Sequence, residues 1–310
     1  MRRLRPATLT MTDRLRSGAL AGTNGSMTGW KRHLVVWGGV VIAAAACVFV
    51  IPYMFSSRGV IGPTLLQAQS PIAACLTLLA GLAAATIVGA VVGRLTNAVV
   101  GLFVIGFGLG MLALRFGSIQ DLAFADGSLP LLALETVLWA CAVLGSTLVV
   151  FWIAGPLGDF AADEEKDPSS SRWSLGGAAA GIVMLPVVWL MARSELRGQT
   201  LAATVLGGLV AGMLARLLSP QTQPRLIFAT ACLAGAVGHV IGAVVIRISN
   251  ADGMAAAYVA STLPAVSLPL PIDYAVGSLI GVAMGLGWAA SFVHHEQEGE
   301  AAPSTASSNQ

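Results

Sequence analysis

Long uninterrupted apolar runs constrain this chain more than any other feature. Eight of them recur along the sequence, at 34–54, 71–93, 97–115, 130–153, 174–192, 200–218, 225–247 and 273–293. A helix of roughly 20 apolar residues crosses the hydrocarbon core of a bilayer. Only 10% of the residues are charged, against about 25% in soluble proteins. We therefore predict an all-α integral membrane protein with eight transmembrane helices and no aqueous domain.

The N-terminal segment sets the predicted orientation. Residues 1–33 contain seven basic residues, and Lys31 and Arg32 directly precede the first apolar run. The positive-inside rule places such a segment in the cytoplasm, and an even number of spans returns the C-terminus to the same side. We expect an inner (plasma) membrane protein with both termini cytoplasmic. Residues 1–26 are expected to be disordered or to precede a true start at Met27, and the polar segment 294–310 to be a disordered tail.

A polar linker at 155–173, which contains DEEKDPSSSR, divides the chain into two halves at 34–154 and 174–293. The halves show similar phrases in the same order. LAGLAAATIVGAVVGR (79–94) matches LAATVLGGLVAGMLAR (201–216), and GFGLGMLALR (106–115) matches GHVIGAVVIR (238–247). Halves of four spans share one orientation, as in the parallel repeats of some transporters. We predict two parallel four-helix repeats; convergent small-residue packing is the alternative.

Glycines four residues apart recur within the apolar runs, and this spacing places each pair on one helical face. Helices in lipid gain little from hydrophobic burial against each other, so close backbone approach at small residues must hold them together. We expect helix packing through a glycine zipper and related seams, which comprise Gly106, Gly110, Gly238, Gly242, Gly277, Gly281 and Gly285. The sequence predicts that leucine at Gly281 is more damaging than leucine at Gly39.

Three ionisable residues lie within or at the mouths of apolar runs, where such groups are costly and often functional. We take Glu135, His239 and Asp273 as candidates for a transport path. Each also has a structural interpretation. His239 could bond a backbone carbonyl or a threonine of a neighbouring helix, Glu135 could pair with Arg115 or Arg247, and Asp273 could cap the last helix.

Other chemistry lacks its motifs. The sequence contains no HExxH, GxSxG, Walker-type loop or CxxC, so we expect no catalytic residues, cofactor or metal. The four cysteines lie in apolar runs and are interpreted as small hydrophobes. Basic residues are at ends and loops rather than on a patch, which argues against a nucleic-acid partner. The segment 253–271 is expected to be an interfacial or re-entrant element. The expected partners are the bilayer, a small solute or ion, and further copies of the chain.

Two functions follow from these features. The first is a secondary transporter or channel-like permease, with Glu135, His239 and Asp273 on its path. The alternative is a non-catalytic membrane scaffold or assembly partner that packs through glycine seams. A permease predicts a cavity that reaches His239, whereas a scaffold predicts solid packing there and an exposed face of small residues.

Overall fold

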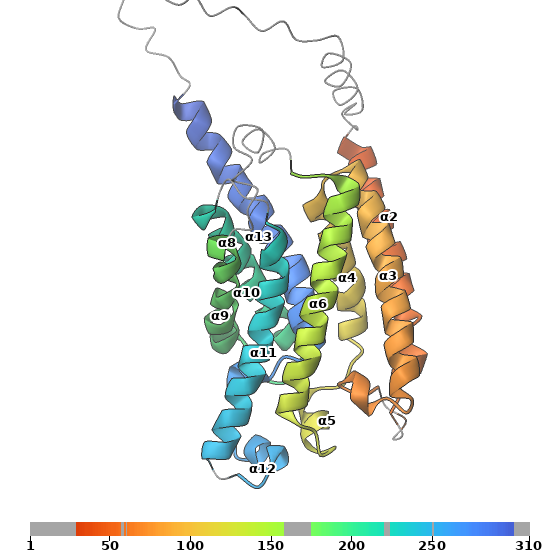
Figure 1. Cartoon of the computed structure of the whole chain (residues 1–310), viewed down its shortest axis with the longest axis vertical. Helices are drawn as coiled ribbons and strands as arrows, with labels where there is room; N and C mark the ends of the chain where they lie inside the picture. The colour runs from red at the N-terminus through yellow and green to blue at the C-terminus, as the bar shows by residue number, and fades with distance from the viewer. Residues whose placement is uncertain are drawn as a thin grey trace, which may run out of the picture.

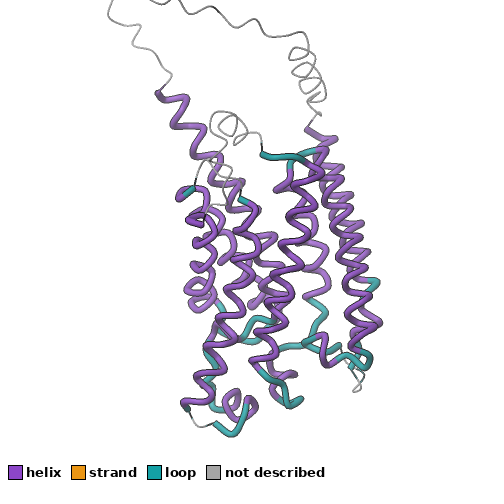
Figure 2. Tube along the Cα trace, in the orientation of Figure 1, coloured by secondary structure: helices purple, strands orange, loops and turns teal. Residues whose placement is uncertain are grey.

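The computed structural model describes residues 29–56, 59, 61–157, 175–219, 224–249 and 251–300, with side chains described as far as Ser291. Every regular element within these ranges is a helix (Figure 2). Two isolated antiparallel bridges, Phe55 with Ile61 and Ser56 with Ala68, hold one connection together. The predicted disordered segment 1–26 and nearly all of the predicted linker lie outside the described residues.

Six helical segments are long and apolar enough to cross a membrane. They are α2 (Gly29–Val48) with its continuation η1 (Ile51–Met54), α3 (Pro71–Leu95), α6 (Leu129–Ala154), α10 (Arg197–Leu218), α11 (Arg225–Ile248) and α13 (Pro271–Glu300). The protein is therefore all-helical in its described part and has the multi-pass character of a helical membrane protein.

The other two predicted spans are shorter apolar helices. Residues 97–115 form α4 (Ala98–Ala113), whose 16 residues extend about 24 Å at 1.5 Å per residue. Residues 174–192 form α8 (Leu175–Ala179), η3 (Ala180–Val183) and α9 (Met184–Met191). These lengths fall below the roughly 30 Å of hydrocarbon, so six membrane-crossing helices are supported and eight remain a prediction.

Short elements fill the connections at one end of the molecule. They are η2 (Leu65–Gln67), α5 (Ile119–Ala123), α12 (Met254–Val259) and η4 (Ala265–Ser267). The segment predicted to be interfacial or re-entrant thus forms α12, at the extremity of the bundle beyond α11 in Figure 1, and η4, which packs against α11 and α9. Helix α13 continues to Glu300, into the segment that the sequence assigns to a disordered tail.

Helices run alternately up and down the bundle (Figure 1). We call the end at which α2 begins and α13 finishes the tail end, and the opposite end, which carries α5 and α12, the loop end. The most extensive contact joins α10 to α13, followed by α6 with α11. Helix α4 packs against α2, α3 and α13, and its residues are mostly buried. Because other helices surround α4 on most sides, its ends lie against protein rather than lipid, and its length need not equal the thickness of the hydrocarbon core.

Glycines mark the closest helix contacts. A Cβ added at Gly277, Gly281 or Gly285 of α13 would lie 2.5, 2.1 and 2.1 Å from α10 backbone atoms, whereas real Cβ atoms essentially never come closer than 3.0 Å to another such atom. The other four glycines named from the sequence also face elements of this chain. Gly106 and Gly110 face α13, Gly238 faces Val266 and Tyr274, and Gly242 faces Ser267 and Leu129.

Candidate functional site

Asp273 is fully buried at the start of α13 and is held by the Leu270 backbone and by the side chains of Arg197 and Thr200 on α10. Its Oδ2 accepts a 2.9 Å hydrogen bond from the Leu270 backbone N–H, which is the capping role considered from the sequence. Its carboxylate also receives both terminal nitrogens of Arg197, at 2.7 and 2.6 Å. The Arg197 side chain is 15% exposed and donates further to Ala113 O at 2.8 Å. One guanidinium therefore ties together the loop ends of α4, α10 and α13.

His239 is fully buried, and both of its ring nitrogens have partners. Nε2 lies 3.0 Å from the Pro269 carbonyl, and Nδ1 lies 3.2 Å from Thr136 Oγ1 on α6. The ring meets Tyr274 edge to face, with centroids 5.8 Å apart. A neutral ring that donates from Nε2 can accept at Nδ1 from the Thr136 hydroxyl, whose single proton is shared between Nδ1 and Leu132 O, 2.7 Å away. This is the structural interpretation raised from the sequence, a histidine bonded to a carbonyl and a neighbouring threonine.

Glu135 is 5% exposed, and its Oε2 is buried without a hydrogen-bond partner among the described residues. The Trp139 indole N–H, one turn further along α6, and the Leu65 backbone N–H are donors near the Glu135 carboxylate, but the indole contact does not reach the geometry of a hydrogen bond. Glu135 makes no ion pair with Arg115 or Arg247, although the structure describes all three side chains. A buried carboxylate oxygen without a partner is unfavourable, so Glu135 is the least satisfied of the three candidates.

All three candidates lie toward the loop end, but they do not form one site. His239 bonds α6 and the connection before α13, and Asp273 bonds α10. Glu135 makes no hydrogen bond to His239 or to Asp273. Arg197 is the residue that sequence reasoning missed. It lies between the predicted outer ends of the spans 174–192 and 200–218, on the same predicted side as Asp273, and this was the available signal.

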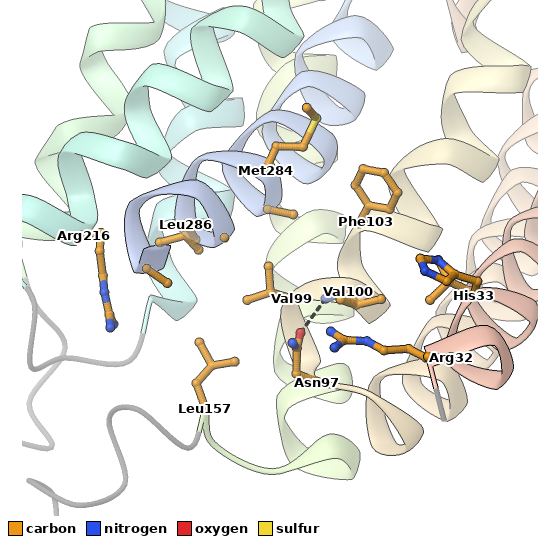
Figure 3. A pocket seen from close by; sticks show the side chains of 15 residues that line it. Arg32, His33, Asn97, Val99, Val100, Phe103, Leu157, Arg216, Met284 and Leu286 are labelled. Carbon is orange, nitrogen blue, oxygen red and sulfur yellow. Dashed lines mark hydrogen bonds between the residues drawn. The ribbon is translucent and has the colours of Figure 1, made fainter. Parts of the chain in front are cut away.

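A cavity of about 680 Å³ lies at the opposite, tail end of the bundle (Figure 3). Residues of α2, α4, α10 and α13 line it, together with Leu157, so both predicted halves contribute. It is lined by Gly29, Arg32, His33, Val36, Asn97, Val99, Val100, Phe103, Leu157, Arg216, Ala283, Met284, Leu286, Gly287 and Ala290. The lining includes none of Glu135, His239 and Asp273.

The polar part of this tail-end cavity carries positive charge. Figure 3 shows Arg32 and His33 on the α2 side and Arg216 on the α10 side. Between them lies the start of α4, where Asn97 Oδ1 accepts a 2.9 Å hydrogen bond from the Val100 N–H. A helix N-terminus adds a partial positive charge of its own. No carboxylate is among the described lining residues, so Arg32 and the start of α4 make the α2 side of the cavity favourable to negatively charged groups.

Comparison of the chain with protein-family models, curated proteins and solved structures found no match in any of the three. The class of protein therefore comes from the structure itself: a helical multi-pass membrane protein with a basic cavity at one end of its bundle.

Proposed function

We propose that this protein is a permease of eight helices in two parallel halves, with the tail-end cavity as its substrate vestibule. The cavity is the observation that carries the proposal. It lies between α2 and α4 of one half and α10 and α13 of the other. Transporters built from repeats bind their substrates at the interface between repeats, and 680 Å³ falls within the roughly 300–1,000 Å³ of ligand pockets.

The pattern of helix contacts supports the two-half arrangement. In the sequence alignment of the halves, α3 and α4 correspond to α10 and α11, and the last helices, α6 and α13, correspond to each other. If the two halves are exchanged, α4 takes the place of α11 and α13 takes the place of α6. The contact between α4 and α13 then becomes a contact between α11 and α6, and the structure contains both contacts. The α6–α13 contact, which also occurs, maps onto itself. Parallel repeats related by a twofold axis along the membrane normal produce this pattern.

In such a permease, the loop end of the bundle is the side at which the substrate path is closed. At this end Arg197 forms an ion pair with Asp273 and donates a hydrogen bond to Ala113 O. His239 of α11 forms hydrogen bonds with Pro269 and Thr136. In our proposal this conformation is open at the tail end and shut at the loop end. When the loop end opens, these bonds break, and Asp273, His239 and the neighbouring Glu135 face the path.

A scaffold is the second candidate, and the enclosure of His239 favours it. A water path to this residue was the feature expected of a permease, yet His239 is 0% exposed and absent from the cavity lining. The glycines weigh against the scaffold. All seven that were expected to form seams face elements of this same chain, which leaves those faces unavailable to partner helices.

Site-directed labelling with a membrane-impermeant maleimide tests the permease proposal. The labelling uses a background from which the native cysteines are removed, namely Cys47, Cys75, Cys141 and Cys232. A single cysteine then replaces either Met284, which lines the cavity, or Thr200, which is buried one turn from Arg197. We expect Met284→Cys to react from one side of a proteoliposome only. Adding Asp273→Asn should raise the labelling of Thr200→Cys from the other side and lower that of Met284→Cys.

The reciprocal change distinguishes the two candidates. A permease exchanges access between the ends, so labelling rises at one reporter as it falls at the other. A rigid scaffold predicts that Asp273→Asn leaves Met284→Cys labelling unchanged, whatever happens locally at Thr200. Labelling of Met284→Cys that does not change with Asp273→Asn would therefore reject the permease.

A further inference from the structure

We propose that the tail-end cavity binds an amphipathic anion, that is, one carboxylate or phosphate head on an apolar chain. This inference rests on the proposed function, because it names the substrate class of the same cavity. The structure divides the cavity into a basic part and an apolar part, and a ligand must satisfy both.

The basic part is built from the starts of α2 and α4, which pack against each other and bring Arg32 beside Asn97 (Figure 3). Arg32 and His33 extend from the first turns of α2 and are exposed. Asn97 caps α4 through the Val100 N–H, and α4 has 16 residues, long enough for a developed dipole. Arginine keeps its charge under all physiological conditions and pairs with carboxylate or phosphate through two parallel hydrogen bonds. The head of the ligand is therefore an anion.

The apolar part follows the basic part along α2, α4 and α13. It consists of Val36, Val99, Val100, Phe103, Ala283, Met284 and Leu286. An inorganic anion would leave this wall against water, and a neutral hydrocarbon would make no use of the basic part. An apolar chain gains about 25 cal/mol for each Å² of its surface removed from water. Only a ligand with both parts uses the whole cavity.

Gly287 offers a way to fill the cavity without disturbing its walls. A Cβ at this position would meet no atom within 4 Å, and Gly287 belongs to the lining. Gly145 of α6 is the matched control, because its Cβ would also meet nothing within 4 Å and it is not a lining residue. Both are helical glycines exposed at the surface, so leucine brings the same change in helix propensity to each.

Binding of radiolabelled decanoate to the full chain in phosphatidylcholine nanodiscs tests the inference, with empty nanodiscs as the blank. We expect saturable binding that unlabelled acetate and decanol displace poorly. Arg32→Gln should weaken binding about tenfold, the loss of one hydrogen bond to a charged group, and Gly287→Leu should abolish it. Arg94→Gln is the control for charge, since Arg94 lies at the tail end, bonds Ile153 O and is not a lining residue.

Replacing part of the phosphatidylcholine by phosphatidylglycerol identifies the source of the anion. Loss of decanoate binding in these nanodiscs assigns the cavity to the head of an anionic membrane lipid, and unchanged binding assigns it to a free amphiphile; both support the shared chemistry. Decanoate binding that is absent, or equal in Arg32→Gln and Arg94→Gln, overturns the inference. The comparison of these two arginine variants holds even if Gly287→Leu fails to fold, because Arg32 is exposed and its substitution disturbs no packing.

The cysteine labelling described above needs no ligand, so the two proposals fail separately. If labelling changes reciprocally but decanoate does not bind, the permease proposal stands and the amphipathic anion is the wrong class of substrate. Decanoate binding without reciprocal labelling would leave an anion site in a protein that does not transport.

Discussion

The contact between α10 and α13 predicts that one methyl group at Gly281 destabilises the protein. A Cβ at Gly281 would lie 2.1 Å from Val205 O, 2.7 Å from Leu209 N and 2.9 Å from Gly208 C. All three are backbone atoms, which cannot rotate away as a side chain can. Since carbon atoms pack at about 3.5–4.0 Å, Gly281→Ala forces the two helices apart by roughly 1 Å.

The cost follows from the contacts that this separation stretches. A gap of about 0.5–1 Å forfeits roughly a quarter to a half of a contact worth about 0.1–0.2 kcal/mol. If on the order of 40 contacts are stretched, as many as one buried leucine makes, the loss is about 1–4 kcal/mol. Overpacked cores lose a similar amount. Alanine also favours the helix by about 1 kcal/mol in soluble hosts, and Gly145→Ala, with no atom within 4 Å of its Cβ, isolates that gain.

Reversible unfolding in mixed micelles, followed by circular dichroism, measures the difference. We expect Gly281→Ala to be less stable than Gly145→Ala by about 1–4 kcal/mol. Gly39→Ala should fall between them, because its Cβ would meet a movable side-chain atom of Val92 at 2.6 Å; the same order should hold for leucine. Equal stability of Gly281→Ala and Gly145→Ala would refute the close approach of α10 and α13.

Three further predictions concern the buried polar groups. Asp273→Asn should lower stability by about 3–5 kcal/mol, since it leaves Arg197 without its ion partner, and a thermal-melt cycle with Arg197→Gln should show coupling between the two sites; additive losses would contradict the pair. Thr136→Val should cost about 1–3 kcal/mol, because it removes the hydroxyl that lies between His239 Nδ1 and Leu132 O. A melting temperature equal to that of wild type would exclude a bond to Nδ1. Glu135→Gln should leave the melting temperature unchanged or raise it, because Oε2 has no described partner to lose; destabilisation equal to that of Asp273→Asn would reveal a partner for the carboxylate.

The long helices could be predicted from apolar runs because lipid requires each span to satisfy its own backbone. Their boundaries shifted where polar residues continue a helix. The first helix begins at Gly29 rather than 34 and includes Lys31 and Arg32, whose stems can lie along the helix at the interface. The two short helices were not foreseen, because hydropathy does not show that a helix such as α4 is surrounded by protein rather than lipid.

The candidate site was harder to predict than the fold. Burial of Asp273 and His239 followed from their small-residue faces, but their partners Arg197 and Thr136 lie 76 and 103 residues away. The cavity was not predicted at all. Its walls come from the ends of four helices that extend from Gly29 to Ala290 in sequence, and periodicity within one helix carries no information on space between helices.

A permease of this design requires the two ends of the bundle to open in alternation. Pulsed electron paramagnetic resonance measures this directly, with one spin-label pair at Trp30 and Leu217 of the tail end and another at Phe124 and Leu196 of the loop end. All four side chains are exposed. We predict that Asp273→Asn shortens the distances of the tail-end pair and lengthens those of the loop-end pair. Distance distributions that remain unchanged at the tail end would contradict alternating access.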